Sequence, residues 1–333
     1  MRAMLLRQPG PIEGQPLALT EIPTPSPEPG QVLIHVSACG LCHTDLHIVE
    51  GELPARKLPV VPGHQIAGQI AALSPGVTRW RVGDRVGLPW LNHTCGQCDF
   101  CQQGTENLCP NAHFTGYHAD GGYAEYTVAW ADFAVPLPEG FPDLQAAPLL
   151  CAGIIGYRAL RLSEVRPGQR LGLYGFGASA HIAVQVAAHW GCQVYVFSRS
   201  EEHRALARKL GAVWAGPAGE ATEKLHSAII FAPASSLVPV GLEALERGGT
   251  LALAGIYMTR VPELDYSRHL YYEKTLRSVA NATRQDAREF LRLAAEIPVR
   301  TEVQTFRLEE ANEALLRLKH GEINGAGVLR VRA

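Results

Sequence analysis

Four cysteines restrict the fold of this chain more than any other feature of its sequence. Cys95, Cys98, Cys101 and Cys109 lie within fifteen positions. This spacing lets four thiolates enclose one tetrahedral metal ion, usually zinc, and a cage closed by four protein ligands is structural and not catalytic. The alternatives, two disulfides or four unrelated buried thiols, fit poorly with a chain that shows no secretory signal. The sequence therefore predicts a structural zinc lobe over residues 92–112.

Length and composition narrow the class of protein. A chain of 333 residues is long for one core, so two domains are expected. With a net charge of −2 and no basic stripe, there is no electrostatic footprint for DNA or RNA. No apolar run approaches the length of a membrane span, and the first ten residues lack the apolar core of a signal peptide. We expect a cytoplasmic protein with no nucleic-acid and no membrane partner.

The pattern of apolar residues changes along the chain. Short strands are predicted at 31–37, 63–73 and 85–88, among many Pro and Gly turns. From about residue 148, predicted strands alternate with predicted helices, which is typical of parallel βαβ units in a doubly wound sheet. The predicted strands of this part are 170–174, 193–197, 228–232 and 251–255, and its predicted helices are 151–162, 178–190, 202–210 and 237–245. The last fifty residues are mixed, with a helix at 309–320 and a strand at 327–331.

A glycine-rich turn separates the first of these parallel strands from its helix. Gly175, Gly177 and Ala180 match the pattern G-x-G-x-x-G/A, in which the first glycine makes the turn and the second lets the backbone approach a pyrophosphate. The small third residue lets the helix pack closely on the strand, and the helix N-terminus offers unpaired N–H groups to phosphates. An ordinary tight turn is the alternative. The strand–turn–helix order favours a dinucleotide site.

The residues after the second parallel strand bear on the choice of dinucleotide. NAD sites usually have an acidic residue there, but this chain has Ser198 and Arg199. An arginine and hydroxyl groups are suited to a 2′-phosphate, so the sequence favours NADP over NAD. The alternative is that Arg199 is only a solvated loop charge.

Three further segments carry residues suited to metal chemistry. Residues 40–47 read GLCHTDLH, residues 63–65 read GHQ, and Cys151 follows two leucines. Spacing alone does not join these segments into one site. Together with the cysteine lobe they occur in the order found in zinc-dependent alcohol dehydrogenases of the medium-chain dehydrogenase/reductase superfamily, and the chain resembles that family over essentially its whole length.

The resemblance implies two zinc ions per subunit, one in the cysteine lobe and one catalytic. The catalytic zinc would be held by Cys42, His64 and Cys151, with water or substrate in the fourth position. Such a ligand set holds zinc firmly and leaves it a Lewis acid.

The resemblance also implies roles for the residues next to Cys42. Thr44 occupies the position that hydrogen-bonds the substrate oxygen, and His47 matches a relay histidine near solvent. Asp45 matches the carboxylate that orients the zinc-bound histidine. His43 matches a residue that contacts the cofactor phosphate. Apart from the family, a lone histidine is more often a surface or core residue.

Four positions bear on the substrate pocket or depart from the family. Trp90 matches a tryptophan that narrows the pocket for short primary alcohols, and Leu53 replaces a second tryptophan, which predicts a wider pocket. Ordinary packing is the alternative for both. Gln65 replaces a glutamate near the metal, from which we expect retained metal binding and altered turnover. Ala326 replaces an arginine that contacts the cofactor, and Arg284 is the candidate to compensate.

The resemblance implies a split α/β architecture and an oxidoreductase. Residues 1–152 and 285–333 would form a mostly-β GroES-like catalytic domain, and residues 153–284 a Rossmann domain that binds NAD(P). The expected reaction is reversible hydride transfer between a primary, or secondary, alcohol and NAD(P)⁺ in a homo-oligomer, either tetramer or dimer. The alternatives are an NADPH-dependent aldehyde reductase of the cinnamyl-alcohol-dehydrogenase type, a zinc-free quinone reductase of the same fold, and a non-enzymatic protein that senses zinc or NAD(P).

Overall fold

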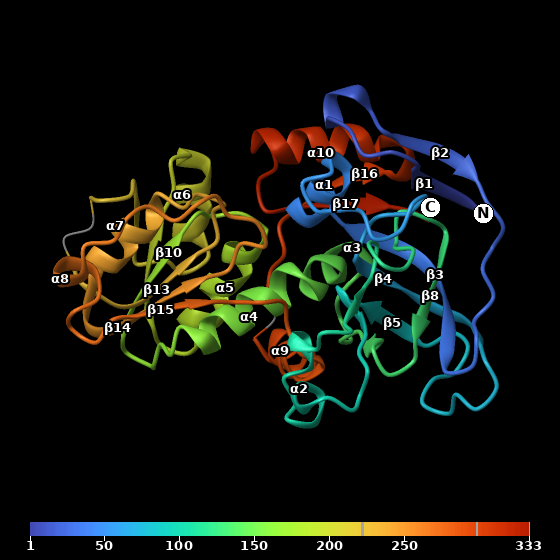
Figure 1. The fold of residues 1–333 in the computed structure, drawn as a ribbon, viewed down its shortest axis with the longest axis horizontal. Coiled ribbons are helices and arrows are strands. Elements are labelled where there is room, and N and C mark those ends of the chain that lie inside the picture. Colours follow the sequence, from blue (N-terminus) through green and yellow to red (C-terminus); the bar gives the residue numbers. More distant parts are fainter. Residues whose placement is uncertain (221–222, 298, 333) are drawn as a thin grey trace. The chain divides into compact units, whose positions relative to one another are not determined.

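The computed structural model describes residues 1–220, 223–297 and 299–332 (Figure 1). The chain divides into two compact units. The first comprises Met1–Cys151, Thr283–Ala295 and Arg300–Ala333, and the second comprises Ala152–Ala282 and Glu296–Val299. Within the described ranges, no helix combines the length and the apolar character needed to cross a membrane.

The first unit is built around a seven-stranded mixed sheet. Strand β3 is central to it, because it pairs with three other strands, and its side chains alternate between buried and half-buried as expected for a half-buried strand. The β16–β17 pair is parallel and the other pairs are antiparallel. The sheet consists of β16 (Val303–Arg307), β17 (Ala326–Arg330), β3 (Gln31–Gly40), β4 (Gln65–Leu73), β5 (Arg85–Leu88) and β9 (Val135–Pro136), in that order, with β8 (Tyr126–Trp130) paired to β3.

Short elements surround this sheet. Helix α10 contacts α1, so the C-terminal part of the chain covers the segment that follows β3. The strands outside the main sheet are β1 (Arg2–Leu6) with β2 (Leu17–Glu21), and β6 (Leu91–His93) with β7 (His113–Phe114). The helices are α1 (His43–Glu50), α2 (Asp99–Gln102), α3 (Asp143–Ala146), α9 (Arg284–Glu296) and α10 (Ala311–His320), with single 3₁₀ turns η1 (Ile12–Gly14), η2 (Glu106–Leu108), η3 (Ala147–Leu150) and η4 (Leu308–Glu310).

The second unit is a parallel sheet flanked by helices (Figure 1). The first strand in the chain, β10, lies between β11 and β13, so the chain winds outward in both directions from it, as in dinucleotide-binding folds. The sheet order is β12 (Trp214–Gly216), β11 (Gln193–Phe197), β10 (Arg170–Tyr174), β13 (Leu225–Ile230), β14 (Leu245–Leu253) and β15 (Thr275–Ser278). The helices are α4 (Ala152–Leu162), α5 (Ala178–His189), α6 (Glu201–Lys209), α7 (Leu237–Ala244) and α8 (Tyr266–His269).

The predicted fold class is confirmed: a mostly-β unit is followed by a doubly wound parallel sheet. The predicted strands at 170–174 and 193–197 coincide with β10 and β11. The short strand β15 was not predicted from the sequence. It lies at the edge of its sheet, and three of its four side chains, those of Thr275, Arg277 and Ser278, are polar and exposed, so it lacks the apolar signal of a buried strand.

Candidate functional site

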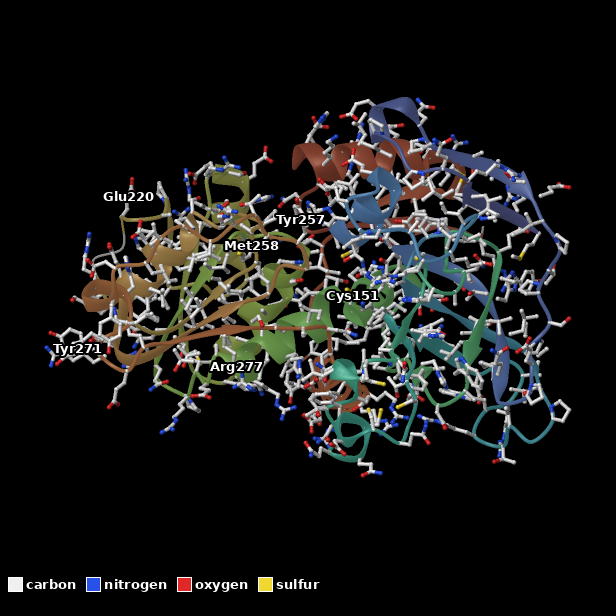
Figure 2. All side chains as sticks on the ribbon, in the orientation of Figure 1. Cys151, Glu220, Tyr257, Met258, Tyr271 and Arg277 are labelled. Carbon is white, nitrogen blue, oxygen red and sulfur yellow. The ribbon has the colours of Figure 1, made fainter. Side chains whose placement is uncertain are left out.

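Three residues that are far apart in the sequence meet inside the first unit. Cys42 is the N-cap of α1, His64 immediately precedes β4, and Cys151, labelled in Figure 2, follows η3. One ligand atom from each of them, two sulfurs and an imidazole nitrogen, lies within 4.8 Å of the other two. The Nε2 atom of His64 is 3.3 Å from Sγ of Cys151, and His64 is fully buried. The arrangement is a convergent set of two sulfur donors and one nitrogen donor.

The carboxylate of Asp45 fixes the orientation of this group. Its Oδ1 atom accepts hydrogen bonds from Nδ1 of His64 at 2.9 Å and from the backbone N–H of Gly63 at 3.2 Å. Its Oδ2 atom accepts from the backbone N–H of Cys42 at 2.9 Å and from the hydroxyl of Tyr123 at 3.2 Å. Asp45 is fully buried and bonds four donors, so one side chain caps the start of α1 and leaves Nε2 of His64 turned to the two cysteines.

Tyr123 and Gly63 depend on each other. Gly63 has φ +98°, and a Cβ at this position would lie 2.3 Å from Cδ1 of Tyr123. Only glycine therefore lets the chain turn into His64 while the ring of Tyr123 packs against it. No pattern in the sequence indicates a role for Tyr123, because it is separated from Asp45 by more than seventy residues.

The site favours positive charge. Burial by itself lowers the pKa of His64, but the carboxylate of Asp45 and the thiol of Cys42 outweigh it and raise that pKa to about 10. A hydrogen bond from Cys151 holds the pKa of the Cys42 thiol well below its usual range. A buried position that favours the protonated form of an imidazole and the thiolate form of a neighbouring cysteine is suited to a cation.

Helix α1 carries the other residues expected near the metal. The Oγ1 atom of Thr44 lies 3.5 Å from Sγ of Cys42. His47 lies one helical turn further on, and a spacing of three residues puts the two side chains on neighbouring positions of one face. His43, at the start of α1, is exposed.

The resemblance placed His47 near solvent, but its side chain is only 9% exposed. Its Nδ1 atom is hydrogen-bonded to a carboxylate oxygen of Glu52, whose side chain is 41% exposed. Glu52 therefore connects a buried histidine with the surface. The sequence reasoning missed this residue, although an acidic residue just after α1 was a visible signal.

Aromatic rings line one side of the three-residue group. The indole ring of Trp90 meets the imidazole of His64 edge-on, with ring centroids 4.8 Å apart. It also stacks on Phe114 at 4.9 Å and on Tyr117 at 5.9 Å. The half-buried Leu53 lies in the segment after α1, where its backbone N–H bonds the carbonyl of His47. Trp90 is thus beside the site, and Leu53 is one hydrogen bond from the predicted relay residue.

The four clustered cysteines also meet. Their sulfur atoms lie within 4.8 Å of one another. Backbone N–H groups of Gln97 and Cys98 lower the pKa of Cys95 to about 6, which favours the thiolate that a metal requires. The lobe is anchored by Glu106, which is only 4% exposed and accepts hydrogen bonds from the backbone N–H of Arg284 at 2.9 Å and from its Nε at 3.2 Å.

The contact between Glu106 and Arg284 bears on the departure at Ala326, for which Arg284 is the candidate to compensate. The guanidinium of Arg284 is held by Glu106 and lies 4.7 Å from the ring centroid of Phe133, so it serves the lobe. Ala326 is the buried first residue of β17.

Gln65, the other position that departs from the family, is buried. Its side-chain amide donates at 2.9 Å to the carbonyl of Leu41, the residue directly before Cys42.

The predicted dinucleotide turn lies in the second unit. Gly175 has φ +86°, and a Cβ there would lie 2.9 Å from Cβ of Ala232. A Cβ on Gly177 would meet nothing within 4 Å, so the space in front of α5 is open. The N-cap of α5 is Gly177, which has no side chain to cap the first N–H groups, and these are the groups that a pyrophosphate would bind. Ala180 is fully buried.

Ser198 and Arg199 lie next to this turn. The backbone N–H of Gly175 bonds the carbonyl of Phe197 at 2.9 Å, which joins the turn to the end of β11. Arg204 donates to the carbonyl of Ser198 at 3.0 Å and so shapes the loop. The side chain of Arg199 is exposed and has no ion-pair partner in the part of the chain that the structure describes.

Comparisons with known proteins agree with this geometry. Residues 28–139 match the alcohol dehydrogenase GroES-like domain family, and residues 180–296 match the zinc-binding dehydrogenase family. A probable alcohol dehydrogenase of Mycobacterium tuberculosis is 47% identical over 99% of this chain and 97% of its own length. A solved thermostable alcohol dehydrogenase from Pyrobaculum aerophilum superimposes with a TM-score of 0.92 at 27% identity, over 99% of both chains. A solved cinnamyl alcohol dehydrogenase from Sorghum bicolor gives a TM-score of 0.90 at 29% identity, over 99% of this chain and 97% of its own.

The fold and the matches define an oxidoreductase with a GroES-like part and a Rossmann part. The chain belongs to the zinc-dependent alcohol dehydrogenases of the medium-chain dehydrogenase/reductase superfamily.

Proposed function

We propose that this chain oxidises primary alcohols, and some secondary ones, to aldehydes or ketones, with reversible transfer of a hydride to NADP⁺ or NAD⁺. The observation that carries the proposal is the convergence of Cys42, His64 and Cys151 at one buried point in a chain that also has an open glycine turn at the start of α5. In this assignment the first unit is the catalytic domain and the second binds the dinucleotide.

The residues present fit the two zinc ions that the family implies. Cys42, His64 and Cys151 supply three donors and leave a position open, as in catalytic sites, while the four lobe cysteines make a closed set. When bound at the first site, zinc would supply a Lewis acid for the oxygen of the alcohol or carbonyl group. Asp45 would hold Nδ1–H of His64, so that Nε2 keeps its lone pair for the metal.

The chain's own side chains would move the proton that alcohol oxidation releases. Thr44 would hold the hydroxyl proton of the substrate, and His47 would accept it as a general base. The contact between His47 and Glu52 would then pass it to solvent. In aldehyde reduction the same groups would deliver a proton in the opposite direction.

The cofactor would bind at the second unit. Gly175 and Gly177 allow the backbone close to the pyrophosphate, and Ala180 lets α5 pack on the sheet. The exposed Arg199, together with Ser198, supports a preference for NADP. His43 remains a predicted phosphate contact.

The substrate pocket would be bounded by Trp90, whose ring lies against His64. With Leu53 in place of a larger ring, we propose that aromatic and branched alcohols enter as well as short ones. The alternative, an NADPH-dependent aldehyde reductase of the cinnamyl-alcohol-dehydrogenase type, is supported by the likeness to the Sorghum bicolor structure. The values of kcat/KM for cinnamaldehyde and for butanal separate the two candidate functions. A clear preference for cinnamaldehyde would favour the aldehyde reductase, and activity with both aldehydes would favour the alcohol dehydrogenase.

The deciding experiment measures reduction of NAD⁺ and of NADP⁺ by a panel of aliphatic and aromatic alcohols. We expect activity in zinc-loaded protein and its loss in the Cys42→Ala and Cys151→Ala variants. No hydride transfer by fully zinc-loaded protein, with any alcohol or aldehyde, would revive the non-enzymatic sensor. We also propose a cytoplasmic homo-oligomer, either tetramer or dimer, which light scattering of the purified protein would test.

A further inference from the structure

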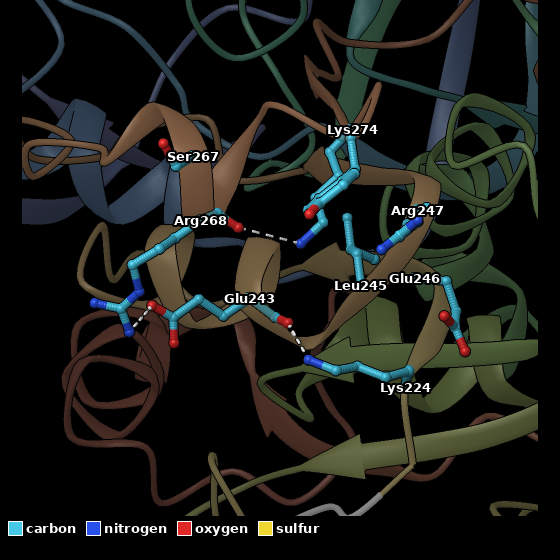
Figure 3. Close-up of a pocket in the computed structure, with 9 residues that line it drawn as sticks. Lys224, Glu243, Leu245, Glu246, Arg247, Ser267, Arg268 and Lys274 are labelled. Carbon is cyan, nitrogen blue, oxygen red and sulfur yellow. Dashed lines mark hydrogen bonds and ion pairs between the residues drawn. The ribbon is translucent and has the colours of Figure 1, made fainter.

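A pocket lies at the amino-terminal ends of three parallel strands of the second unit (Figure 3). Lys224 immediately precedes β13, Arg247 lies near the start of β14, and Lys274 immediately precedes β15. The cavity has a volume of about 430 Å³, within the range of small-molecule sites. The glycine turn follows the carboxyl end of β10 in the same parallel sheet, so the pocket is at the opposite edge from the dinucleotide site.

The two carboxylates at this pocket are already paired. Glu243 accepts from Arg268 at 2.7 Å and contacts Nε2 of His269 at 3.2 Å. Glu246 accepts from Arg170 at 3.1 Å. Among the described residues, neither of these acidic side chains forms an ion pair with the remaining cations around the cavity.

Three cations are left without a carboxylate partner among the residues that the structure describes. The Nζ atoms of Lys224 and Lys274 donate to neighbouring carbonyls in the last turn of α7, at 2.7 and 2.6 Å, which keeps the two ammonium groups close together. The guanidinium of Arg247 lies 4.2 Å from the ring centroid of Tyr272. Burial, and then the charge of Lys224, lower the pKa of Lys274, and the charge of Glu243 offsets this only in part. The fold therefore holds like charges together, and no ion pair with a described carboxylate joins them.

We propose that this pocket binds a small phosphate-bearing anion. Phosphate oxygens accept from lysine ammonium groups as point charges and from a guanidinium in paired bonds, so the three free cations match this ligand class. Binding would also relieve the repulsion between the two lysines. The pocket is open to solvent through the exposed side chains of Lys224 and Arg247, and the ligand would enter from that side. The site is independent of the proposed reaction.

The test follows thermal unfolding of the full chain in inorganic phosphate against sodium chloride at equal ionic strength. Because a ligand that binds only the folded state raises its stability, we expect phosphate to raise the midpoint by about 3 °C more than chloride does. Arg247→Gln, which removes an exposed side chain whose contact is with Tyr272, should abolish most of this rise. Arg166→Gln makes the same charge change at an exposed position of the same unit and should keep the rise.

Further arms identify the source of the phosphate and exclude the dinucleotide site. A stronger rise with pyrophosphate indicates an inorganic ligand, and a stronger rise with AMP indicates a nucleotide. The phosphate effect should persist in saturating NAD⁺. If the rise is the same in Arg247→Gln and Lys274→Met as in the parent, or disappears when NAD⁺ is present, the proposal is wrong.

Discussion

The imidazole of His47 is hydrogen-bonded through Nδ1 to the carboxylate of Glu52, five residues further along the chain. The histidine is buried, and the glutamate reaches the surface. The pair therefore provides a link that a buried histidine alone could not make. In the proposed reaction, Glu52 stabilises the protonated imidazole and gives its proton a route to water.

Replacing this carboxylate should slow proton transfer in the reaction. We expect Glu52→Gln to lower kcat/KM for alcohol oxidation by about tenfold, since one group of a proton path is lost. A small added buffer base such as imidazole should restore part of the lost rate. Glu21→Gln, at an exposed glutamate of β2, is the control and should show neither effect. A decrease that no added buffer restores would mean that Glu52 only supports the structure.

Asp45 should control how tightly the first site holds its metal. Asp45→Asn removes the charge that orients His64, and we expect zinc affinity to fall about 10- to 100-fold, measured by competition with a chromogenic chelator. Tyr123→Phe removes one of the four donors to Asp45 and should give a smaller loss in the same direction. Tyr117→Phe, whose hydroxyl instead donates to the carbonyl of Pro54, should leave zinc affinity unchanged. Equal losses in the two tyrosine variants would contradict the assigned network.

The sequence predicts β10 and β11 with the bounds that the structure gives, because buried strands are continuous apolar runs. The predicted strands 228–232 and 251–255 overlap only the ends of β13 and β14, and the three-residue β12 was not predicted. The sequence also does not predict β15, an edge strand with polar exposed residues. Helix α9 is clearly amphipathic and could have been found by its spacing. For the site, the three candidate zinc ligands came from resemblance, because no periodicity joins residues 42, 64 and 151. Tyr123 becomes visible only when the fold brings it to Asp45, whereas Glu52 follows α1 directly and its contact with His47 could have been proposed from the sequence.

Gln65 provides a test of a residue that departs from the family. Its amide donates to the carbonyl of Leu41, so a glutamate in the same conformation would set a carboxylate oxygen against that carbonyl. We expect Gln65→Glu to lower the free energy of unfolding by about 1–3 kcal/mol, because a buried acceptor loses its donor. Zinc content should be retained while turnover changes. Gln69→Glu, at a half-buried position further along β4, is the matched control. Unchanged kinetics in Gln65→Glu would dismiss an effect on turnover.

Arg199 should set the choice between the two dinucleotides. We expect Arg199→Asp to lower the ratio of kcat/KM for NADP⁺ to kcat/KM for NAD⁺ by about 100-fold. The aspartate would repel the 2′-phosphate of NADP⁺, which the arginine attracts, and it would accept a hydrogen bond from the ribose 2′-hydroxyl of NAD⁺. Arg208→Asp changes the same charge on the following helix and should leave the ratio unchanged. A ratio that is insensitive to Arg199 would identify this arginine as a solvated loop charge.

The contact between Glu106 and Arg284 should contribute to stability more than an exposed ion pair does. Glu106 is buried and accepts both the backbone N–H and the Nε of Arg284 at the start of α9, where a negative charge also favours the helix dipole. We expect Glu106→Gln to lower the free energy of unfolding by about 1–2 kcal/mol. Glu313→Gln breaks an exposed pair with Arg317 and should cost less than about 0.5 kcal/mol. Urea unfolding with an unchanged m-value would show that both changes act on the folded state, and equal costs would contradict an anchoring role for Glu106.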